Sequence, residues 1–204
     1  MADRVRIIGG SWRGRWLEVA DLPGLRPTGD RVRETLFNWL QNDISGSVCL
    51  DLFAGSGALG FEAASRGARE VHLVEQNSVV AGQLGKQIEQ FSSDASATDE
   101  RYDNNALVSV HCADTQMILA GKPSARVEGG LPAADIVFVD PPFTSQLQSD
   151  VLQALHKNGW LRPQGLVYIE MERGELQSIL PENWAIHRES SAARVTFGLV
   201  YPGC

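Results

Sequence analysis

The segment Val48-Cys49-Leu50-Asp51-Leu52-Phe53-Ala54-Gly55-Ser56-Gly57-Ala58-Leu59-Gly60 decides the fold of this chain. It opens with a short apolar run typical of a buried strand, breaks into small residues, and continues into helix-forming residues at 61–64. Such a turn presents backbone N–H groups and the positive end of a helix dipole to a ligand. The three glycines have the G-x-G-x-x-G spacing of dinucleotide sites, although a turn that simply needs glycine has the same spacing.

Strand-like and helix-like segments alternate after this turn, which predicts an α/β fold with a mostly parallel, doubly wound sheet. Before the turn, residues 5–19 predict a β-hairpin, residues 21–29 a loop, and Asp30 the N-cap of a helix. The later expected strands are 70–74, 107–112, 135–139 and 165–171, followed by two antiparallel segments, 184–190 and 193–201. The expected helices are 77–91, 114–120, 145–158 and 173–180, and residues 92–105 are a polar surface insertion.

Composition limits the class of protein. The 204 residues are 43% apolar and suit one domain with a real core, and no apolar run approaches the ~18 residues of a membrane helix. The N-terminus has no secretory h-region. The three cysteines are far apart and form no C-x-x-C pair, so neither a zinc site nor a disulfide framework is expected. These features predict a soluble, reduced, cytoplasmic protein without a metal.

Charge is distributed unevenly along the chain. The net charge is −7, yet residues 1–33 contain seven arginines and four acidic residues, whereas the remainder contains 11 basic and 21 acidic residues. A basic arm on an acidic body favours nucleic acid as a partner, and arginine suits both phosphates and base stacking. A solvated basic hairpin without a partner is the alternative.

Two acidic residues decide which cofactor suits the glycine turn. Glu75 ends the next strand, where a carboxylate binds the ribose diol of NAD or of S-adenosylmethionine. Asp51 stands just before the turn, where it would repel a pyrophosphate but attract the ammonium and sulfonium groups of S-adenosylmethionine. The residues therefore favour S-adenosylmethionine.

The segment Asp51–Gly60 together with Asp140-Pro141-Pro142-Phe143 resembles the amino-group methyltransferases of the Rossmann-like class. The stretches 6–15 and 25–40 narrow the resemblance to the bacterial ribosomal RNA small-subunit methyltransferase D family, from about residue 4 to the end of the chain. The resemblance implies a class I methyltransferase fold with a seven-stranded sheet, and methylation of N2 of a guanine (guanine 966) in 16S rRNA. It also implies a basic arm at 1–29, a methyltransferase domain at 30–204, and a monomer that acts on the small ribosomal subunit.

The resemblance also assigns roles to residues. The Asp140 carboxylate and the Pro141 carbonyl would accept hydrogen bonds from the two N–H groups of the target amine. Pro142 would restrict the backbone, and Phe143 would stack on the flipped base. The cofactor would be bound by Asp51, Phe53, Ala54, Gly55, Ser56, Gly57, Glu75, Gln76, Ala113 and Asp114. RNA would be bound by Arg6, Trp12, Arg13, Arg15, Arg26, Arg31 and Arg33.

Several alternatives remain open from the residues alone. An N6-adenine or other amino-methyltransferase acting on DNA or another RNA shares the core motifs. An NAD-dependent dehydrogenase is disfavoured by Asp51, and a non-enzymatic RNA-binding module by the intact Asp140–Phe143 motif. Asp114 suits a helix N-cap as well as a cofactor ligand. Residues 26–28 could contact RNA or fold over the cofactor.

Overall fold

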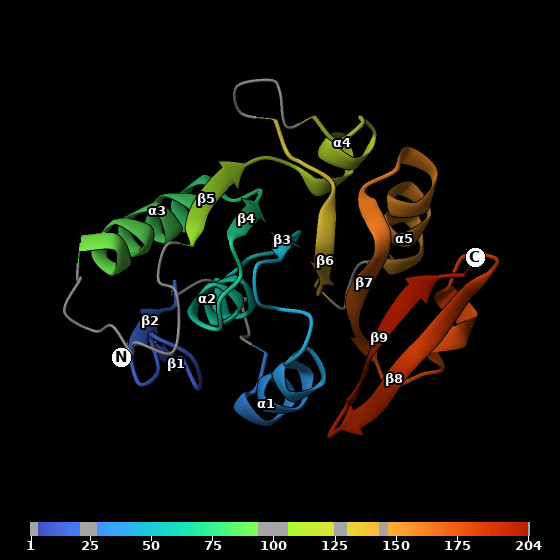
Figure 1. Cartoon of the computed structure of the whole chain (residues 1–204), viewed down its shortest axis with the longest axis horizontal. Helices are drawn as coiled ribbons and strands as arrows, with labels where there is room; N and C mark the ends of the chain where they lie inside the picture. The colour runs from blue at the N-terminus through green and yellow to red at the C-terminus, as the bar shows by residue number, and fades with distance from the viewer. Residues whose placement is uncertain (1–3, 21–27, 94–105, 125–129, 143–146, 204) are drawn as a thin grey trace.

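A computed structural model describes residues 4–20, 28–93, 106–124, 130–142 and 147–203 (Figure 1). Its main sheet has seven strands in the order β5-β4-β3-β6-β7-β9-β8. The strands β3 to β7 are parallel, whereas β9 runs antiparallel to both β7 and β8. Their bounds are β3 Val48–Asp51, β4 Glu70–Glu75, β5 Leu107–Cys112, β6 Ala134–Val139, β7 Leu161–Glu172, β8 Trp184–Ala192 and β9 Val195–Pro202.

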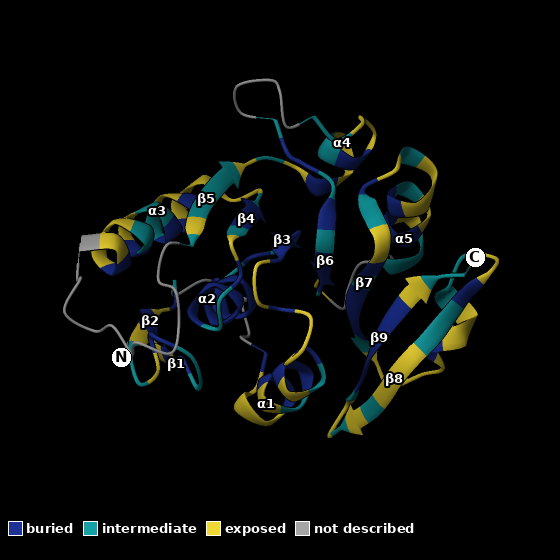
Figure 2. Ribbon diagram, in the orientation of Figure 1, coloured by how far each residue is buried: buried dark blue, intermediate teal, exposed yellow. Residues whose placement is uncertain are grey.

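Helices cover both faces of this sheet, so the central strands are buried on both sides (Figure 2). One face packs against α1 (Asp30–Trp39), α2 (Ala58–Ser65) and α3 (Ser78–Ser93). The other face packs against α4 (Thr115–Leu119), α5 (Leu147–Asn158) and the 3-10 turn η1 (Leu176–Ile179). The predicted mostly parallel seven-stranded sheet is confirmed. Among the described residues, no helix combines the length and apolarity needed to cross a membrane.

Three local predictions differ from the structure. The expected helix 173–180 is only the 3-10 turn η1, because Gly174 and Pro181 flank it and leave no room for further helical turns. The strand β7 begins four residues earlier than expected, and its pairing with β6 shifts register between Ala134 and Ile136 of β6. Gly29 rather than Asp30 is the N-cap of α1, since the Asp30 carboxylate instead pairs with Arg33 at 2.6 Å.

The N-terminal hairpin forms its own two-stranded antiparallel sheet, with β1 at Arg4–Arg6 and β2 at Trp16–Glu18. Its buried side chains belong to the same apolar cluster as α1, α2 and α3. Trp12 lies 6.3 Å from Phe61 and 5.0 Å from Phe91 between ring centroids. The arm therefore shares a core with the large sheet, and burial of its apolar residues fixes it in place.

A buried carboxylate attaches the hairpin to the helices. Glu62 has no exposed side-chain surface and accepts hydrogen bonds from the backbone N–H groups of Ile8 at 2.9 Å and Gly9 at 2.8 Å. The same carboxylate lies 2.7 Å from Nε of Arg66 and 3.4 Å from Nη1 of Arg33. Glu62 thus connects the segment between β1 and β2 to α1 and α2, and its charge is compensated by two guanidinium groups.

Candidate cofactor and substrate site

The candidate site lies at the carboxyl edge of the sheet between β3 and β6. The chain leaves β3 toward β4 on one side and leaves β6 toward β7 on the other, which makes this pair a topological switch point. Asp51 ends β3, and Asp140 follows the end of β6. The backbone N–H of Leu52 donates to the carbonyl of Phe138 at 3.1 Å, so the two strand ends are held together. The fold therefore places both predicted aspartates at the switch point, and in sheets of this kind ligands bind in the crevice outside the strand ends there.

Two glycines make the turn after β3 possible. Gly57 has φ of +76°, and a Cβ there would lie 2.7 Å from Phe61 and 2.8 Å from Leu84. A Cβ on Gly60 would lie 2.2 Å from Cδ2 of Leu73. Larger residues at these positions would push α2 away from β4, so the glycines hold the N-terminus of α2 against the strand ends.

Asp51 is a buried carboxylate beside the N-terminus of α2. Its side chain is 2% exposed, and it accepts backbone hydrogen bonds from Gly60 at 3.0 Å and from Phe53. Burial raises the pKa of Asp51 to about 7, and the negative charges of Asp140 and Glu75 contribute to the rise. The site therefore holds a carboxylate whose charge the protein itself does not neutralise well.

Glu75 connects the end of β4 to the glycine turn. Its carboxylate accepts hydrogen bonds from the backbone N–H groups of Gly55 at 3.0 Å and Asn77 at 2.8 Å. A carboxylate has about four lone-pair positions, so acceptor capacity is left for the hydroxyls of a ribose. Gln76 is exposed beside it. Of the other predicted cofactor residues near the turn, Ala54 and Ser56 are buried and Phe53 is half-buried.

Asp114 stands where β5 leads into α4. Its carboxylate accepts hydrogen bonds from the backbone N–H groups of Gln116 at 2.7 Å and Met117 at 3.3 Å, which confirms its expected role as an N-cap. The N–H of Ala113 donates to the carbonyl of Glu75 at 3.1 Å, so this turn lies beside the end of β4. Contact between the exposed Asp114 side chain and a cofactor remains a prediction.

The donor set fits S-adenosylmethionine better than a dinucleotide. The charges that act on Asp51 are those of two further carboxylates, Asp140 and Glu75. An anionic crevice attracts a ligand with an ammonium and a sulfonium group and repels a doubly charged pyrophosphate. Within the described ranges, no group of three or more His, Cys, Asp or Glu side chains is placed to hold a metal ion.

Asp140 is held by a residue from the N-terminal part of the chain. The hydroxyl of Thr28 donates a hydrogen bond of 2.9 Å to Oδ2 of Asp140. Burial raises the pKa of Asp140, and this hydrogen bond partly offsets the rise. Pro141 is buried and Pro142 is exposed, whereas Phe143 lies outside the described residues.

The sequence reasoning missed two polar residues on β7 that lie near Asp140. The hydroxyl of Tyr168 donates to Oε2 of Glu170 at 2.8 Å, and both side chains are buried. Burial and the charge of Asp140 raise the pKa of Glu170. The sequence did contain a signal for Glu170, because it is an acid inside the apolar run 167–171. A strand between two helical layers carries few polar side chains, so an acid there is unusual.

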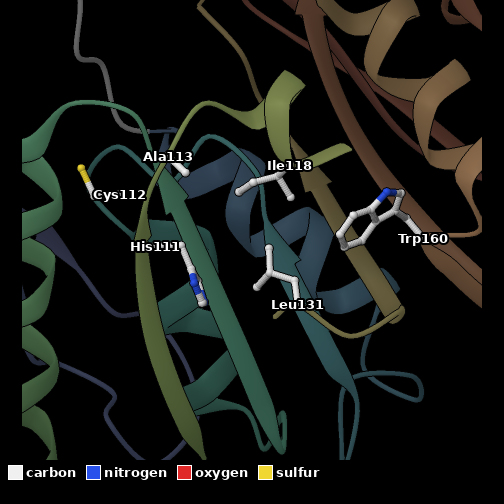
Figure 3. Close-up of a pocket in the computed structure, with 6 residues that line it drawn as sticks. All are labelled: His111, Cys112, Ala113, Ile118, Leu131 and Trp160. Carbon is white, nitrogen blue, oxygen red and sulfur yellow. The ribbon is translucent and has the colours of Figure 1, made fainter. Parts of the chain in front are cut away.

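A cavity lies beneath α4, between the end of β5 and the segments that lead into β6 and β7, and the predicted cofactor residue Ala113 lines it (Figure 3). It has a volume of about 320 Å³ and is lined by His111, Cys112, Ala113, Ile118, Leu131 and Trp160. Neither predicted aspartate of the switch point lines it. On the same face of the sheet, Nδ1 of His72 lies 3.1 Å from Nε2 of His111, and Nε2 of His72 lies 2.9 Å from Glu70. Both histidines thus bond to neighbouring side chains.

The predicted RNA-binding residues separate into two groups. Arg6, Arg13 and Arg31 are exposed, whereas Arg15 is half-buried with its guanidinium 3.7 Å from the ring centroid of Phe91. The predicted RNA contact of Trp12 is wrong, because this residue is only 7% exposed and its ring packs in the core.

The predicted RNA contact of Arg33 is also wrong. Its guanidinium is fully buried, forms ion pairs with Asp30 and Glu62, and donates a hydrogen bond to the carbonyl of Arg6. Arg26 lies outside the described residues.

Comparison with known proteins agrees with this geometry. The family model described as "Conserved hypothetical protein 95" matches residues 5–201. The chain is 42% identical over 196 residues to "Ribosomal RNA small subunit methyltransferase D" of Escherichia coli (strain K12), covering 96% of this chain and 89% of the relative. It is 42% identical over 198 residues to the protein of that name from Haemophilus influenzae, covering 96% and 92%.

Solved structures show the same fold. "Putative methyltransferase yhhF from Escherichia coli" has a TM-score of 0.78 at 38% identity and covers 99% of both chains. The fold is also that of a putative RNA methyltransferase from Pyrococcus horikoshii, with a TM-score of 0.66 at 18% identity over 92% of this chain and 93% of that one.

The strand order, the glycine turn and the acidic switch point define a class I, Rossmann-like methyltransferase. Within that class, the chain belongs to the ribosomal RNA small subunit methyltransferase D family.

Proposed function

We propose that the protein methylates the exocyclic N2 amine of a guanine in 16S rRNA, guanine 966 in the customary numbering, with S-adenosylmethionine as methyl donor. It acts as a monomer on the small ribosomal subunit. The observation that carries the proposal is the position of Asp140 and Pro141 beside Asp51, at the ends of adjacent strands. Relatives that are 42% identical bear the name of rRNA small subunit methyltransferases, which supports this substrate class.

The residues of the crevice have distinct roles in this proposal. Asp51 and the turn at Gly55 and Gly57 hold the amino-acid part of the cofactor, and Glu75 holds its ribose. When bound, S-adenosylmethionine supplies a methyl group on a positively charged sulfur, which leaves as a neutral thioether. Positioning two reactants in this way accounts for roughly 7–11 kcal/mol of barrier reduction in well-aligned systems.

Asp140 and Pro141 act on the nucleophile. The lone pair of a guanine amine is delocalised into the ring, which makes the nitrogen a poor nucleophile. We assign the Asp140 carboxylate and the Pro141 carbonyl as acceptors for its two N–H bonds, which turns the remaining lone pair toward the methyl group. A new N–C bond would form as the C–S bond of the bound cofactor breaks, and the Asp140 carboxylate would accept the proton that the nitrogen then loses. The ionised form of Asp140 carries no proton, so its carboxylate can accept a hydrogen bond from the amine in addition to the one from Thr28.

The target base must leave its stack to reach this crevice, as in other enzymes that modify a base. Phe143 follows Pro142 and is assigned to stack on the flipped base. The exposed arginines Arg6 and Arg13 of the arm and Arg31 of α1 are assigned to rRNA phosphates. Arg15 remains available only in part, because its guanidinium lies over Phe91.

The test is transfer of a labelled methyl group from S-adenosylmethionine to small subunits purified from cells that lack this enzyme, followed by nucleoside analysis. We expect labelled N2-methylguanosine, and calorimetry should detect binding of S-adenosylhomocysteine but not of NAD. Labelled N6-methyladenosine would replace the guanine assignment with the adenine alternative. If the wild-type protein binds the cofactor but transfers no methyl group to rRNA, the proposed substrate is refuted.

A further inference from the structure

We propose that Trp16 is a stacking platform for an unpaired base of the RNA substrate, with Arg4, Arg6 and Arg13 on the neighbouring phosphates. This inference rests on the proposed function, because it concerns how the same substrate is held. It replaces the predicted role of Trp12, whose ring is buried.

Trp16 lies on the outward face of the hairpin. Both hairpin strands alternate exposed, buried, exposed, so Val5 and Leu17 point inward while Arg4, Arg6, Trp16 and Glu18 point outward. Trp16 pairs directly with Arg6 across the two strands. Side chains directly opposite in an antiparallel pair have Cβ atoms about 4.5–5.5 Å apart, so the indole and the arginine occupy one patch.

The exposure of Trp16 is unusual within this chain. Its residue is 55% exposed, whereas Trp12, Trp160 and Trp184 are 7%, 2% and 4% exposed. Trp39 is half-buried and stacks on Phe197 with an interplanar angle of 29°. A large aromatic side chain left in water loses the stabilisation that burial would give, so an exposed tryptophan among arginines points to a partner.

The charge around Trp16 selects the chemistry of that partner. Arg4, Arg6 and Arg13 are exposed, and the acid on this face, Glu18, stands opposite Arg4 at the far end of the hairpin. A Cβ at Gly14 would lie 3.5 Å from Nη2 of Arg6, so this guanidinium extends toward the loop that carries Arg13. Guanidinium groups beside an aromatic ring fit a nucleotide, which offers a phosphate and a π-face together.

The partner base must be unpaired. A base within an A-form helix is stacked on both sides, and the deep major groove of that helix does not admit side chains. The open indole of Trp16 therefore fits a nucleotide in a loop, a bulge or a strand end. Proteins that bind single-stranded RNA in this way combine stacking rings with a positively charged surface.

The experiment compares Trp16→Leu with Trp16→Phe and a control, Trp39→Phe. Binding to deproteinised 16S rRNA is measured by its effect on tryptophan fluorescence and by a separate filter assay, across a range of salt concentrations. Loss of one stacked base corresponds to a 5- to 150-fold weaker affinity, from about 1–3 kcal/mol per base. We expect this loss in Trp16→Leu, little change in Trp16→Phe, and an unchanged salt slope in both, because no phosphate contact is removed.

Fluorescence gives a direct readout of stacking. RNA should quench the wild-type protein and Trp39→Phe, and the quenching should be lost in Trp16→Phe although that variant still binds. Quenching that persists in Trp16→Phe would overturn the inference, and so would wild-type affinity in Trp16→Leu. Weaker methylation of assembled subunits by Trp16→Leu with unchanged affinity for naked rRNA would also overturn it, because the patch would then contact a protein of the subunit.

Methyl transfer separates this inference from the proposed function. If wild-type protein transfers no methyl group to unmodified subunits, the proposed function fails. If wild-type protein does transfer and Trp16→Leu has the same KM and the same RNA affinity, only the role of Trp16 fails. The expected result is a raised KM for subunits with a nearly unchanged kcat, since Trp16 lies on the arm and not at the strand ends.

Discussion

The hydroxyl of Thr28 donates a hydrogen bond of 2.9 Å to Oδ2 of Asp140, although the two residues are 112 positions apart in the chain. Thr28 is 9% exposed, and its carbonyl accepts a hydrogen bond from Nε of Arg33 at 3.2 Å. Arg33 in turn pairs with Glu62, which binds the backbone of the hairpin. The basic arm and the candidate reaction site are therefore connected through a chain of buried polar contacts.

Replacing Thr28 with valine should raise the pKa of Asp140. The pKa is about 6 in the intact protein, raised by burial and held down by the Thr28 hydrogen bond. A donor to the carboxylate stabilises the ionised form, so its loss raises the pKa further. Because the ionised form of Asp140 accepts the hydrogen bond from the target amine, kcat/KM should increase as pH rises through the pKa of Asp140. In Thr28→Val this ascending limb should lie at higher pH.

Thr28→Ser is the matched control because it keeps the hydroxyl and removes only a methyl group. Its pH profile for methyl transfer should overlap that of the wild-type protein. If the valine and serine variants lose activity equally at every pH, Thr28 contributes only to packing.

Glu62→Gln should destabilise the fold strongly. Glu62 and Arg33 form an ion pair with no exposed surface on either side chain, and removing one partner leaves a buried charge with fewer contacts. Breaking a buried pair typically costs about 3–5 kcal/mol, which for a domain of 150–250 residues corresponds to a fall in Tm of roughly 6–20 °C. Thermal unfolding followed by circular dichroism measures the change.

The control for Glu62 is the ion pair between Arg162 and Asp135, which is shorter, at 2.8 Å against 3.4 Å, but leaves 36% and 35% of the two side-chain surfaces exposed. Arg162→Gln should cost about 1 kcal/mol or less, as exposed pairs do. An equal loss of stability in both variants would mean that burial does not determine the contribution of Glu62.

The sequence predicted the order of strands and helices because apolar runs and turn residues alternate clearly along the chain. It did not predict the short η1, where Gly174 and Pro181 override the local pattern. The switch point followed from Asp51 and Asp140, since both stand at the ends of apolar runs.

The site was only partly predictable because some contacts depend on tertiary packing. The hairpin contains both Trp12 and Trp16, and only the strand register shows that the second points outward. Arg33 belongs to a basic stretch, yet its position on the inner face of α1 directs it to Glu62. The Thr28–Asp140 bond spans 112 residues, so no local pattern could reveal it.

Arg6→Gln and Arg13→Gln, combined in one protein, should weaken RNA binding and flatten its salt dependence. Each phosphate contact adds about 0.7–0.9 to the slope of log K against log salt, so two lost contacts should reduce the slope by roughly 1.4–1.8. Filter binding to 16S rRNA at several salt concentrations measures it. Arg194→Gln, an exposed arginine between β8 and β9, is the control and should leave the slope unchanged. Equal slopes in all three proteins would exclude phosphate contacts by the arm.

The raised pKa of Asp51 also has a consequence for stability. Its folded-state pKa of about 7 lies above the ordinary value of 3.8, so between these values the folded protein binds more protons than the unfolded chain. Stability from this group is therefore lost as pH rises from about 4 toward about 7. The cofactor-free protein at neutral pH thus holds a destabilising charge that a cationic ligand would compensate.

Asp51→Asn should consequently stabilise the cofactor-free protein while weakening cofactor binding. The side-chain carbonyl can still accept the Gly60 N–H, which lies 3.0 Å away in the wild-type protein, but the uncompensated charge is gone. We expect a higher Tm at pH 8, by about 2–4 °C for each 1 kcal/mol, and a difference that disappears near pH 4. Affinity for S-adenosylmethionine, measured by calorimetry, should fall roughly 10- to 150-fold with the loss of a charge-assisted hydrogen bond. Asp150→Asn, at an exposed acid in the first turn of α5, should leave cofactor affinity unchanged and should not raise Tm, since an acid there stabilises the helix dipole. A variant at Asp51 that binds the cofactor normally would show that this carboxylate does not recognise the cationic ligand.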